Sequence, residues 1–550
     1  MRGWIIVLAL GCAPPQPEDK ADGSRATLPS GPAGRPAPIL AGPPMPQNKA
    51  GLVINEVIAA NESQWQEPAD YSTPDWLELF NASDVAIPLA DVEVKFGGGK
   101  WQGSTGEIAP GGYFFLVVDG LTDNADHAPY GINALGEEIE LEVDHDVVDR
   151  ISTGPMYDDV VWARFPDGGA WLPSIRATPG WTNGSSPPES LDPRDSVFQR
   201  DHVLRVDLLL SDGDITALNA SSSNNEVWVV GDIVVDGTQF PGAAVRLKGS
   251  GSFQTLTGKP NFKLDLNAED TSVRYRGLRA LTLNSGNIFD PSRTHEFLAY
   301  ELAREAGLVA PRVGWVRVYV NEEDYGLYQN VETWDEEFYQ RWWPTQTTGQ
   351  LFEGDYFSCE FGDGEDPTTC KYDEGPEIPD YTGLVELDVL VEGGANGPAK
   401  SDLWTKLNHD RWLTYMAWEG IIDHWDGYMS PNNWRFFEDG QTGLIEWLPS
   451  GTDWSWDGPP DVYGGNGNVT NLCLDIGDCK REYEDYVVAV ADISDSLDLP
   501  TTLMDLRTWL HDEIVSDPRS DHSIGDINDT FDTTMQYLQE NPEDARQDVQ

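Results

Sequence analysis

Two aspartates in the second half of the chain have the spacing that phosphoryl transfer requires. Asp426 precedes the amide pair Asn432 and Asn433, and Asp453 follows a short apolar stretch that ends at Pro449. One carboxylate can orient an acceptor hydroxyl, while an amide and a second carboxylate hold divalent cations that neutralise a triphosphate. The alternative is that both aspartates lie in acidic surface loops, because the chain is rich in Asp. The spacing thus leaves two interpretations, a catalytic pair or solvated loops.

A group of basic residues lies upstream of these aspartates, around a loop of Gly and Ser. The segment contains Arg246, Lys248, Ser250, Lys259 and Lys263. Backbone amides of such a loop, together with nearby lysines, can bind phosphate groups. The alternative is a β-hairpin whose lysines lie on solvated edge positions, and the spacing alone favours neither. A nucleotide site at this loop is therefore one of two open interpretations.

The composition excludes some partners and favours others. Lys plus Arg number 35 and Asp plus Glu 94, so the formal net charge of the 550 residues is −59. Such a surface repels nucleic acid and anionic lipid heads, and it attracts divalent cations and basic partners. The chain also holds 21 Trp, 19 Tyr and 18 Phe, an aromatic content typical of packed β-rich domains. We therefore expect a folded, acid-coated protein without a nucleic-acid partner.

The N-terminus has the features of an export signal in residues 1–12. Arg2 precedes an apolar run from Trp4 to Leu10, and Cys12 follows a glycine. A basic residue, a short apolar core and small residues before a cleavage point describe such a signal. A Cys at this place resembles the lipidated first residue of a bacterial lipoprotein. Ala9 departs from that pattern, so plain secretion is the alternative.

A tether is predicted to follow the signal. Residues 13–49 are dominated by Pro, Gly and Ala and lack apolar periodicity, which is typical of an extended linker. No run of about 18 apolar residues occurs further along, so the sequence predicts membrane contact only through a lipid anchor. We expect an extracytoplasmic protein at the bacterial envelope or cell surface, lipid-anchored or secreted.

Four cysteines remain after Cys12, and an even number in an exported chain favours disulfides. We expect local pairing of Cys359 with Cys370 and of Cys473 with Cys479, although four cysteines allow three pairings. Zinc is the competing interpretation, but the closely spaced Cys pairs typical of structural zinc sites are missing. Acidic segments lie within each pair, and they predict either a Ca²⁺ site or disulfide-closed acidic loops.

Residues 50–185 contain short apolar strands separated by Gly, Pro and Asp turns, which predicts a β-sandwich. The expected strands are 52–58, 75–81, 92–96, 113–118, 139–143 and 160–165. A linker rich in Pro and Ser follows at 186–201.

Four segments of this first domain resemble the lamin-tail domain and occur in its order: Ile54 to Glu56, Asp75 to Asn81, Pro110 to Phe114 and Thr178 to Asn183. The resemblance implies an all-β, immunoglobulin-like sandwich. It also implies that Asn55, Glu56, Asp75 and Glu78 stabilise loops rather than act in catalysis.

Residues 202–545 form a second, larger domain in this interpretation. Its expected strands are 203–210, 227–235, 313–320 and 325–331. A helix is expected between Asp290, which can cap its start, and Gly307, which can end it. Further helices are expected at 403–423 and beyond Leu503. The pattern predicts an α+β domain with a β-rich front half and a helical back half.

The motifs of the larger domain are similar, in order, to the spore-coat CotH kinase family. They are Arg246 to Ser252, Lys259 to Leu264, Asp290 to Arg293, Tyr319 to Glu332, Asn432 with Asn433, and Pro449 to Ser455. The resemblance implies an atypical protein-kinase-like fold. It also implies phosphate transfer from ATP to Ser or Thr of extracytoplasmic proteins, with Mg²⁺ or Mn²⁺.

Carried onto this chain, the resemblance gives Asp426 the place of the catalytic-loop residue and Asp453 that of the metal-binding carboxylate. Asn432 or Asn433 takes the place of the second metal ligand. Lys259 or Lys263 would bind the nucleotide phosphates, and Glu332 would lie near the nucleotide.

One position departs from the family pattern. The family often carries an Asp-x-Asp pair, and the place of its first acid is Gly451 in this chain. Asp457 or Glu446 is then the candidate to replace that acid. The departure leaves an alternative function open, namely a catalytically inactive surface structural or adhesion protein on a kinase-like scaffold.

Overall fold

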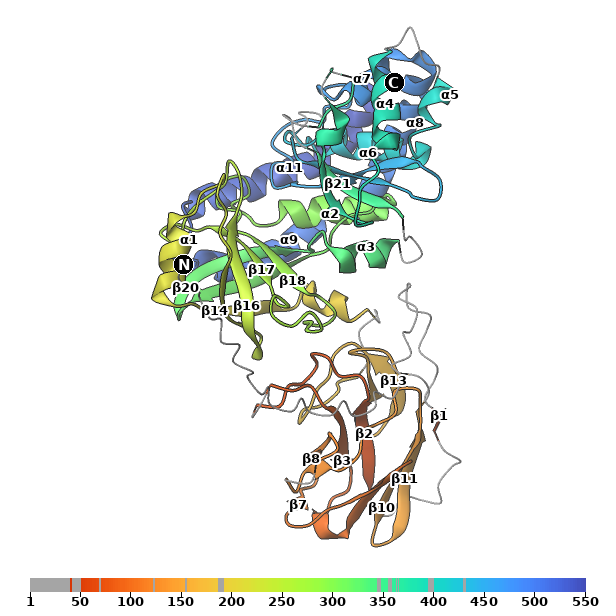
Figure 1. Ribbon diagram of the computed structural model, residues 1–550, viewed down its shortest axis with the longest axis vertical. Coiled ribbons are helices and arrows are strands. Elements are labelled where there is room, and N and C mark those ends of the chain that lie inside the picture. The colour runs from red at the N-terminus through yellow and green to blue at the C-terminus, as the bar shows by residue number, and fades with distance from the viewer. Residues whose placement is uncertain are drawn as a thin grey trace, which may run out of the picture.

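The computed structural model describes a β-rich N-terminal part, a barrel and a helical part (Figure 1). The described residues are 40–41, 51–68, 71–121, 124–153, 156–185, 192–343, 348–354, 359–362, 364, 366–393, 400–428 and 432–550. The predicted signal with Cys12, and the predicted tether except for Leu40–Ala41, lie outside these residues.

Two sheets form the N-terminal part. One has the order β1 (Leu40–Ala41), β11 (Asp146–Ser152), β10 (Glu138–Val143), β5 (Val92–Phe96) and β6 (Gly99–Gln102). The other has the order β13 (Ala170–Ser174), β12 (Val161–Phe165), β2 (Leu52–Ile58), β3 (Asp75–Asn81), β8 (Tyr113–Val118) and β9 (His127–Ala128). A small pair joins β4 (Ile87–Pro88) to β7 (Glu107–Ile108).

Both sheets contribute to one core, because apolar side chains from each are fully buried in the same cluster. Ile54 and Leu79 come from one sheet, and Val94 and Leu141 come from the other. The six strands expected in this region are present, within a residue or so at their ends. The strands β6, β11 and β13 were not predicted.

The buried glutamates of this part hold its closing loop. Glu56 and Glu78 are opposite each other on β2 and β3 and have no exposed surface. Glu56 accepts hydrogen bonds from Thr178, at 2.6 Å from the hydroxyl, and Glu78 accepts one from Gly180 N at 2.5 Å. Burial raises the pKa of Glu56 to about 8 and that of Glu78 to about 7. The contacts agree with the loop-stabilising role predicted for these residues.

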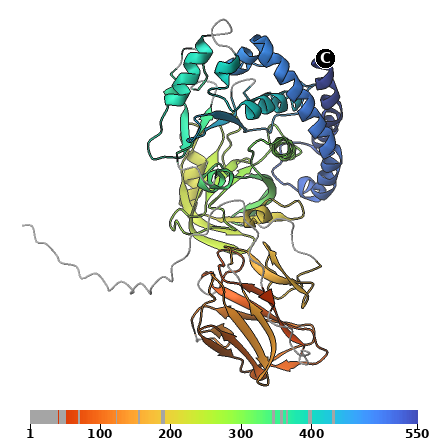
Figure 2. The ribbon, with the colours of Figure 1, turned by 90° about the vertical axis from the view of Figure 1, so that its right-hand side faces the viewer.

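The N-terminal sheets contact the barrel at the end that lies away from the helical part (Figure 2). The amide of Gln66 makes two hydrogen bonds to the backbone of Gln239, at 3.1 and 2.8 Å.

Seven strands form the barrel, which closes because β14 pairs in parallel with β19. Their order is β14 (Val203–Leu209), β15 (Val229–Val235), β16 (Thr238–Lys248), β17 (Asn261–Asp265), β18 (Ala280–Asn284), β20 (Glu323–Val331) and β19 (Val313–Val320). Val245 and Leu247 are fully buried in the barrel core. Since side chains alternate along a strand, Arg246 and Lys248 lie on the outer face of β16. The four strands predicted here are present, but closure into a barrel was not predicted.

Two helices accompany the barrel, α1 (Asp212–Ala220) and α2 (His295–Glu305). The predicted stop of α2 is confirmed, but Thr294 rather than Asp290 is the N-cap residue, so the helix begins four residues later than the prediction. The Asp290 carboxylate accepts a hydrogen bond from His295 N at 2.9 Å, and Gly307 follows the helix with φ of +88°.

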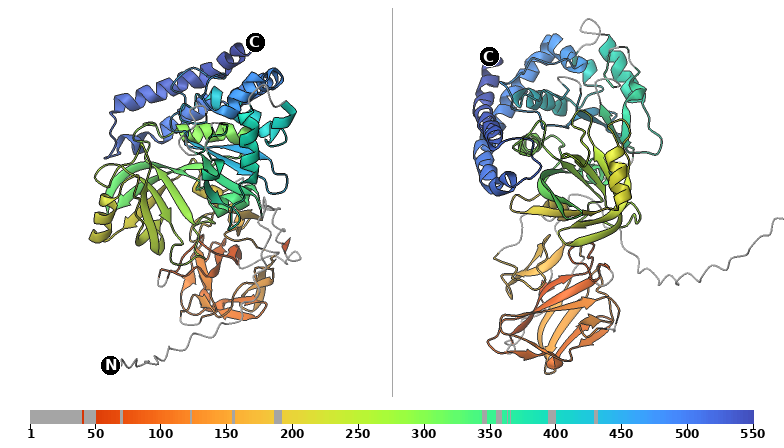
Figure 3. Two further views of the ribbon diagram at one scale, coloured as in Figure 1. Left: turned by 45° about the horizontal axis from the view of Figure 1, so that its top comes forward. Right: turned by 90° about the vertical axis from the view of Figure 1, so that its left-hand side faces the viewer.

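The helical part surrounds a four-stranded sheet of order β22 (Lys371–Glu374), β21 (Gln350–Gly354), β23 (Trp434–Glu438) and β24 (Ile445–Pro449). Its helices are α3 (Glu336–Trp342), α4 (Thr382–Glu392), α5 (Lys400–Leu403), α6 (His409–Ile421), α7 (Asn468–Asp475), α8 (Gly477–Leu497), α9 (Leu499–Trp509), α10 (His511–Val515) and α11 (Ile524–Asp548). The long helix α11 runs beside both the barrel and the helical part (Figures 1 and 3). The β-rich front half and helical back half therefore match the expectation.

The sequence interpretation missed α8, a helix of 21 residues. Its buried residues Tyr483, Val487 and Val490 recur at helical spacing, which was the available signal. Among the described residues, no helix combines the length and apolar character that crossing a bilayer requires.

Candidate active site

Asn284 bridges Lys248 on the barrel and Glu296 on α2 through hydrogen bonds. Lys248 ends β16, Asn284 ends β18, and Glu296 lies in the first turn of α2. Lys248 Nζ donates to Asn284 Oδ1 at 2.6 Å, and Asn284 Nδ2 donates to Glu296 Oε2 at 2.8 Å. Burial lowers the pKa of Lys248 to about 8, and the Glu296 and Asp453 carboxylates oppose part of that shift. The lysine is therefore a cation held against acids, not a solvated edge residue.

The predicted catalytic loop between α6 and β23 brings its three polar residues together. Asn432 Nδ2 and Asn433 Nδ2 each donate to one carboxylate oxygen of Asp426, both at 2.6 Å. The backbone supports the same arrangement, since Asn433 N donates to Asp426 O at 2.8 Å. Burial raises the pKa of Asp426, and the hydrogen bond from Asn432 opposes that rise.

Asp453 follows β24 and lies close to the acids of the other elements. Burial raises the pKa of its carboxyl to about 8. Repulsion from three neighbouring carboxylates adds to the rise, and these belong to Glu296, Asp290 and Asp426. Neighbouring carboxylates raise one another's pKa when they lie close together and are partly shielded from water. The two aspartates singled out from the sequence thus share one site.

Aromatic rings next to these acids in the sequence also meet. Phe289, Trp425 and Trp454 are each direct neighbours of one of the aspartates. The Trp454 ring stacks on Phe289 with centroids 4.7 Å apart and lies 4.5 Å from the Trp425 ring. Because the three come from three separate loops, their contact independently brings those loops together.

Two histidines contact backbone carbonyls at Asp453 and three residues before it. His295, the first residue of α2, has Nδ1 at 3.1 Å from Asp453 O and Nε2 at 2.8 Å from the hydroxyl of Thr534 on α11. His424 Nε2 donates to Ser450 O at 3.1 Å. Burial lowers the pKa of His424 to about 4, so this ring is neutral at physiological pH. Both histidines therefore position the backbone around Asp453.

The glycine at the place of the family's first acid fits its surroundings closely. Gly451 has φ of +63°, and a Cβ there would lie 2.7 Å from Asn433 Cβ and 2.9 Å from Asn433 Nδ2. Its N–H donates to the hydroxyl of Tyr300 at 3.1 Å. Any side chain at 451 would therefore push against Asn433.

Neither of the expected substitutes for that acid lies in the site. Asp457 is exposed and accepts from Trp454 Nε1 at 2.9 Å. Glu446 is buried beside Arg411, at 3.6 Å. The acids next to Asp453 are instead Asp290 and Glu296, which the sequence interpretation had not assigned to the site. A Lys on a strand followed by an acid on the next helix is the kinase arrangement, and it was the signal for Glu296.

Three of the residues predicted to bind nucleotide gather on one side of the site. Arg246 and Lys263 are opposite each other on β16 and β17, and both lower the pKa of Lys248. Ser250 is exposed in the turn that follows β16. The Arg246 guanidinium also pairs with Glu226.

Two others are engaged elsewhere, which corrects their place in the predicted site. The side chains of Lys259 and Asp517 have no exposed surface and form an ion pair, and Lys259 Nζ also donates to Leu327 O at 2.8 Å. Glu332 accepts from Arg312 Nη2 at 2.5 Å and from Arg341 Nη1 at 3.1 Å. Both side chains are buried and paired with protein groups, so the structure supports a role for them in holding the fold.

The described site matches a known family. The sequence model for the CotH kinase protein family matches residues 245–505, a range that includes Lys248, Glu296, Asp426 and Asp453. Residues 245–505 belong to the CotH kinase family. The inner spore coat protein H of Bacillus subtilis (strain 168) is 23% identical over 231 residues, which are 38% of this chain and 61% of that protein. The chain thus spans less than two thirds of the length of this curated relative.

Both predicted disulfides of the CotH domain are present. Cys359 pairs with Cys370 and Cys473 with Cys479, with Cα atoms 4.7 and 5.2 Å apart. The local pairing is confirmed, and a zinc site on these cysteines is excluded.

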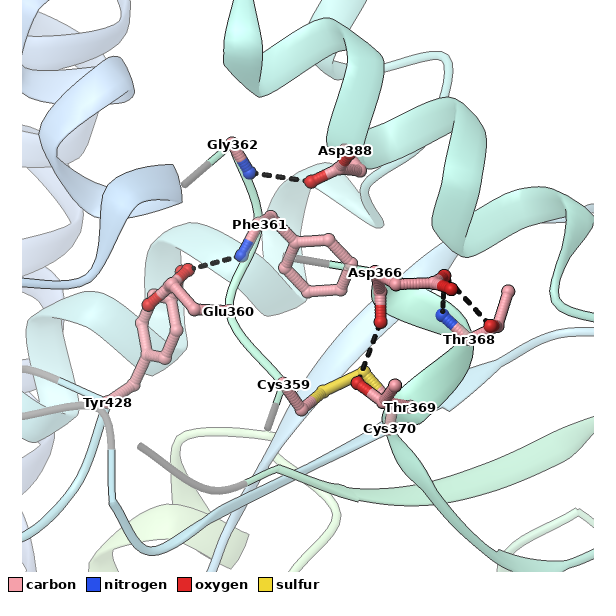
Figure 4. Close-up of a disulfide and its surroundings, with 10 residues drawn as sticks. All are labelled: Cys359, Glu360, Phe361, Gly362, Asp366, Thr368, Thr369, Cys370, Asp388 and Tyr428. Atoms are coloured by element: carbon pink, nitrogen blue, oxygen red, sulfur yellow. Dashed lines mark hydrogen bonds between the residues drawn. A yellow bond between two sulfur atoms is a disulfide. The ribbon is translucent and has the colours of Figure 1, made fainter. Parts of the chain in front are cut away.

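The acidic residues near the first disulfide bond to the protein itself (Figure 4). Asp366 accepts from Thr368 N at 3.0 Å, and Glu360 accepts from the Tyr428 hydroxyl at 2.8 Å. Asp363 and Glu365 of the same loop lie outside the described residues. Within the described parts of the chain, no group of three or more His, Cys, Asp or Glu side chains could hold a metal ion by itself.

The donor chemistry of the CotH site can be compared with what Mg²⁺ requires. Mg²⁺ is usually bound through one or two carboxylates together with substrate phosphates and water. Asp453 supplies a carboxylate, Asn432 and Asn433 supply amides, and Lys248 supplies a cation for phosphate oxygens. The residues present therefore suit a nucleotide that brings its own metal ligands.

Proposed function

We propose that this protein is an atypical protein kinase that transfers the γ-phosphoryl group of ATP to Ser or Thr hydroxyls, with Mg²⁺ or Mn²⁺. The observation that carries the proposal is the convergence of Lys248, Glu296, Asp426 and Asp453 from four separate elements. In phosphoryl transfer, positioning and charge neutralisation supply nearly all of the catalysis.

Each residue has a role that its surroundings support. Lys248, held by Asn284 and Glu296, binds phosphate oxygens, and Arg246 and Lys263 add positive charge beside it. Asp426 is the group placed to accept the proton of the attacking hydroxyl, and its amide partners keep the carboxylate oriented. The oxygen of that hydroxyl forms the bond to phosphorus as the bond to ADP breaks.

A metal ion would be held by Asp453 and by Asn432 or Asn433. When bound, such an ion supplies positive charge that neutralises the phosphates. The raised pKa of Asp453 supports this assignment, because a carboxyl crowded by other acids is stabilised as an anion by a nearby cation. A Ca²⁺ requirement at the disulfide-closed loops has no comparable support.

We further propose that residues 50–185 are an immunoglobulin-like lamin-tail domain and that the CotH domain has a protein-kinase-like fold. The two sheets around one core support the first assignment. The order Lys, Glu, Asp426, Asp453 along strand, helix and two loops supports the second. The acceptors are proposed to be extracytoplasmic proteins, reached after export through the signal at 1–12 and anchoring at Cys12, or after secretion.

An inactive scaffold is the second candidate, and Gly451 is the observation in its favour. The site lacks the first acid of the family's Asp-x-Asp pair. Asp290 and Glu296 lie beside Asp453, so the site is not short of carboxylates, and we favour the kinase.

The test uses the purified full chain with γ-labelled ATP and Mn²⁺, and with the protein itself and a Ser/Thr-rich peptide as acceptors. Asp453→Asn should lower phosphate incorporation by about 100-fold or more, as for the loss of one preorganised charge in other sites. Asp457→Asn, which changes an exposed acid four residues away, should keep the wild-type rate. Wild-type incorporation no greater than that of Asp453→Asn would contradict the proposal.

A binding measurement separates the two candidates. ATP with Mn²⁺ should raise the melting temperature, since a ligand that binds only the folded state stabilises it by mass action. An unchanged melting temperature would favour the inactive scaffold.

A further inference from the structure

A buried tyrosine joins the catalytic loop to two distant segments. Tyr428 lies two residues after Asp426 and has no exposed surface. Its hydroxyl donates to Glu360 Oε1 at 2.8 Å and accepts from Val469 N at 3.2 Å. Both hydrogen bonds are buried, so water does not readily replace either of them.

One partner of that hydroxyl lies in a segment closed by a disulfide, and the other lies on a helix that carries a second disulfide. Glu360 follows Cys359, which is bonded to a cysteine 11 residues later (Figure 4). Val469 lies in the first turn of α7, which also carries Cys473, bonded to a cysteine 6 residues later. The segments also contact each other, because Asn468 Nδ2 donates to the carbonyl of Phe361 at 2.9 Å.

Packing against neighbouring side chains and backbone also confines the ring of Tyr428. Its centroid lies 4.8 Å from that of Trp434 and 5.4 Å from that of Trp447. A Cβ at Gly467, the residue before α7, would lie 2.4 Å from Tyr428 Cε1. The backbone of α7 therefore packs directly on the ring.

We infer that Tyr428 is a positioning residue for Asp426. The segment closed by Cys359–Cys370 fixes it on one side, and helix α7, which Cys473–Cys479 ties to the first turn of α8, fixes it on the other. Only Gly427 separates the two residues, so a shift of the tyrosine moves the backbone that carries the Asp426 carboxylate. The disulfides restrict the two segments that hold the hydroxyl, and through it they restrict the catalytic loop. The consequence for catalysis rests on the proposed kinase function, whereas the consequence for loop order does not.

The first test compares Tyr428→Phe with Tyr483→Phe. Tyr483 on α8 is a similarly buried tyrosine, and its hydroxyl donates to Val462 O at 2.6 Å rather than to Glu360. Each variant loses one buried hydroxyl, so a general loss of stability should appear in both. Tyr428→Phe should accelerate hydrogen exchange in peptides that contain Asp426, and Tyr483→Phe should not. Equal exchange near Asp426 in the two variants would overturn the inference.

The activity arm uses the same pair of variants. Tyr428→Phe should lower kcat, by up to about 100-fold if the carboxylate moves by about 1 Å. The KM for ATP should change less than kcat, because Lys248, Arg246 and Lys263, to which we assign the phosphate contacts, lie on the barrel strands. If the wild-type protein transfers no phosphate, the kinase proposal fails, while the exchange measurement still decides whether Tyr428 orders the loop.

The second test changes the partners of the hydroxyl. Glu360→Gln keeps an oxygen acceptor for Tyr428 and should leave exchange near Asp426 as in the wild type, whereas Glu360→Ala should accelerate it. Replacing either cysteine pair by Ala should reproduce the effect of Glu360→Ala. If neither cysteine variant changes exchange near Asp426, the role assigned to the disulfides is wrong.

Discussion

Because Gly451 packs closely against Asn433, replacing it with alanine should destabilise the fold in two ways, through its backbone conformation and through a steric clash. In Gly451→Ala the new residue must adopt a left-handed conformation, which costs about 1–2 kcal/mol for an L-amino acid. Its Cβ must also push Asn433 away from contacts of 2.7–2.9 Å. Overpacking of that kind costs about 1–3 kcal/mol. The expected total loss in the free energy of unfolding is therefore about 2–5 kcal/mol.

A matched glycine isolates the second cost. Gly443 has φ of +70°, and a Cβ there would meet no atom within 4 Å. Gly443→Ala should lose only the conformational part, about 1–2 kcal/mol. Urea denaturation of both variants measures the difference, which should be about 1–3 kcal/mol. Equal losses would show that position 451 does not face Asn433 and would refute the placement of the two loops.

The same substitution carries a functional consequence. Asn433 donates to Asp426, so displacing it should lower phosphate transfer by about 100-fold while Gly443→Ala remains active. Gly451→Asp, which restores the acid of the family pattern, should likewise lower activity rather than raise it. A gain of activity in Gly451→Asp would contradict this account.

The other predictions concern charge. Lys248→Met should abolish the rise in melting temperature caused by ATP with Mn²⁺ and leave the fold intact. Lys259→Met should instead lower the free energy of unfolding by up to about 3–5 kcal/mol in urea, because Asp517 loses one of its two buried cations and keeps Arg293 at 3.4 Å. For Glu56, the folded-state pKa of about 8 exceeds the ordinary value of 4.5. Unfolding therefore releases a proton from Glu56 at any pH between about 4.5 and 8. The free energy of unfolding should then fall as pH rises from about 4.5 to 8, by up to about 1.4 kcal/mol per pH unit, and Glu56→Gln should flatten that slope. An equally steep slope in the variant would contradict burial of a neutral Glu56.

Local parts of the site could be predicted from the sequence. Asp426, Asn432 and Asn433 lie in one loop, so their spacing already limits how far apart they can be. The helix α2 was predicted because Asp290 and Gly307 are signals that act within a few residues. The disulfides were predicted for the same reason, since short loops are the easiest to close.

The assignments that went wrong depend on contacts far apart in the chain. Lys248 and Lys259 look alike in sequence, and only the ion pair with Asp517, 258 residues later, places Lys259 in the interior. Barrel closure likewise depends on β14 meeting β19, which no local pattern reveals. Glu296 was overlooked because periodicity predicts a helix without saying what its first turn faces.

The position of Asp517 and Thr534 in the chain has a consequence for the order in which the site can assemble. Lys259 and Arg293 share Asp517 as their counter-ion, and His295 obtains its hydroxyl partner from Thr534. Synthesis from the N-terminus produces these partners 224 to 258 residues after the side chains that need them. A growing chain therefore holds the charges of Lys259 and Arg293 unneutralised until Asp517 has been made, and so the site around Asp453 should take its final form only after that point.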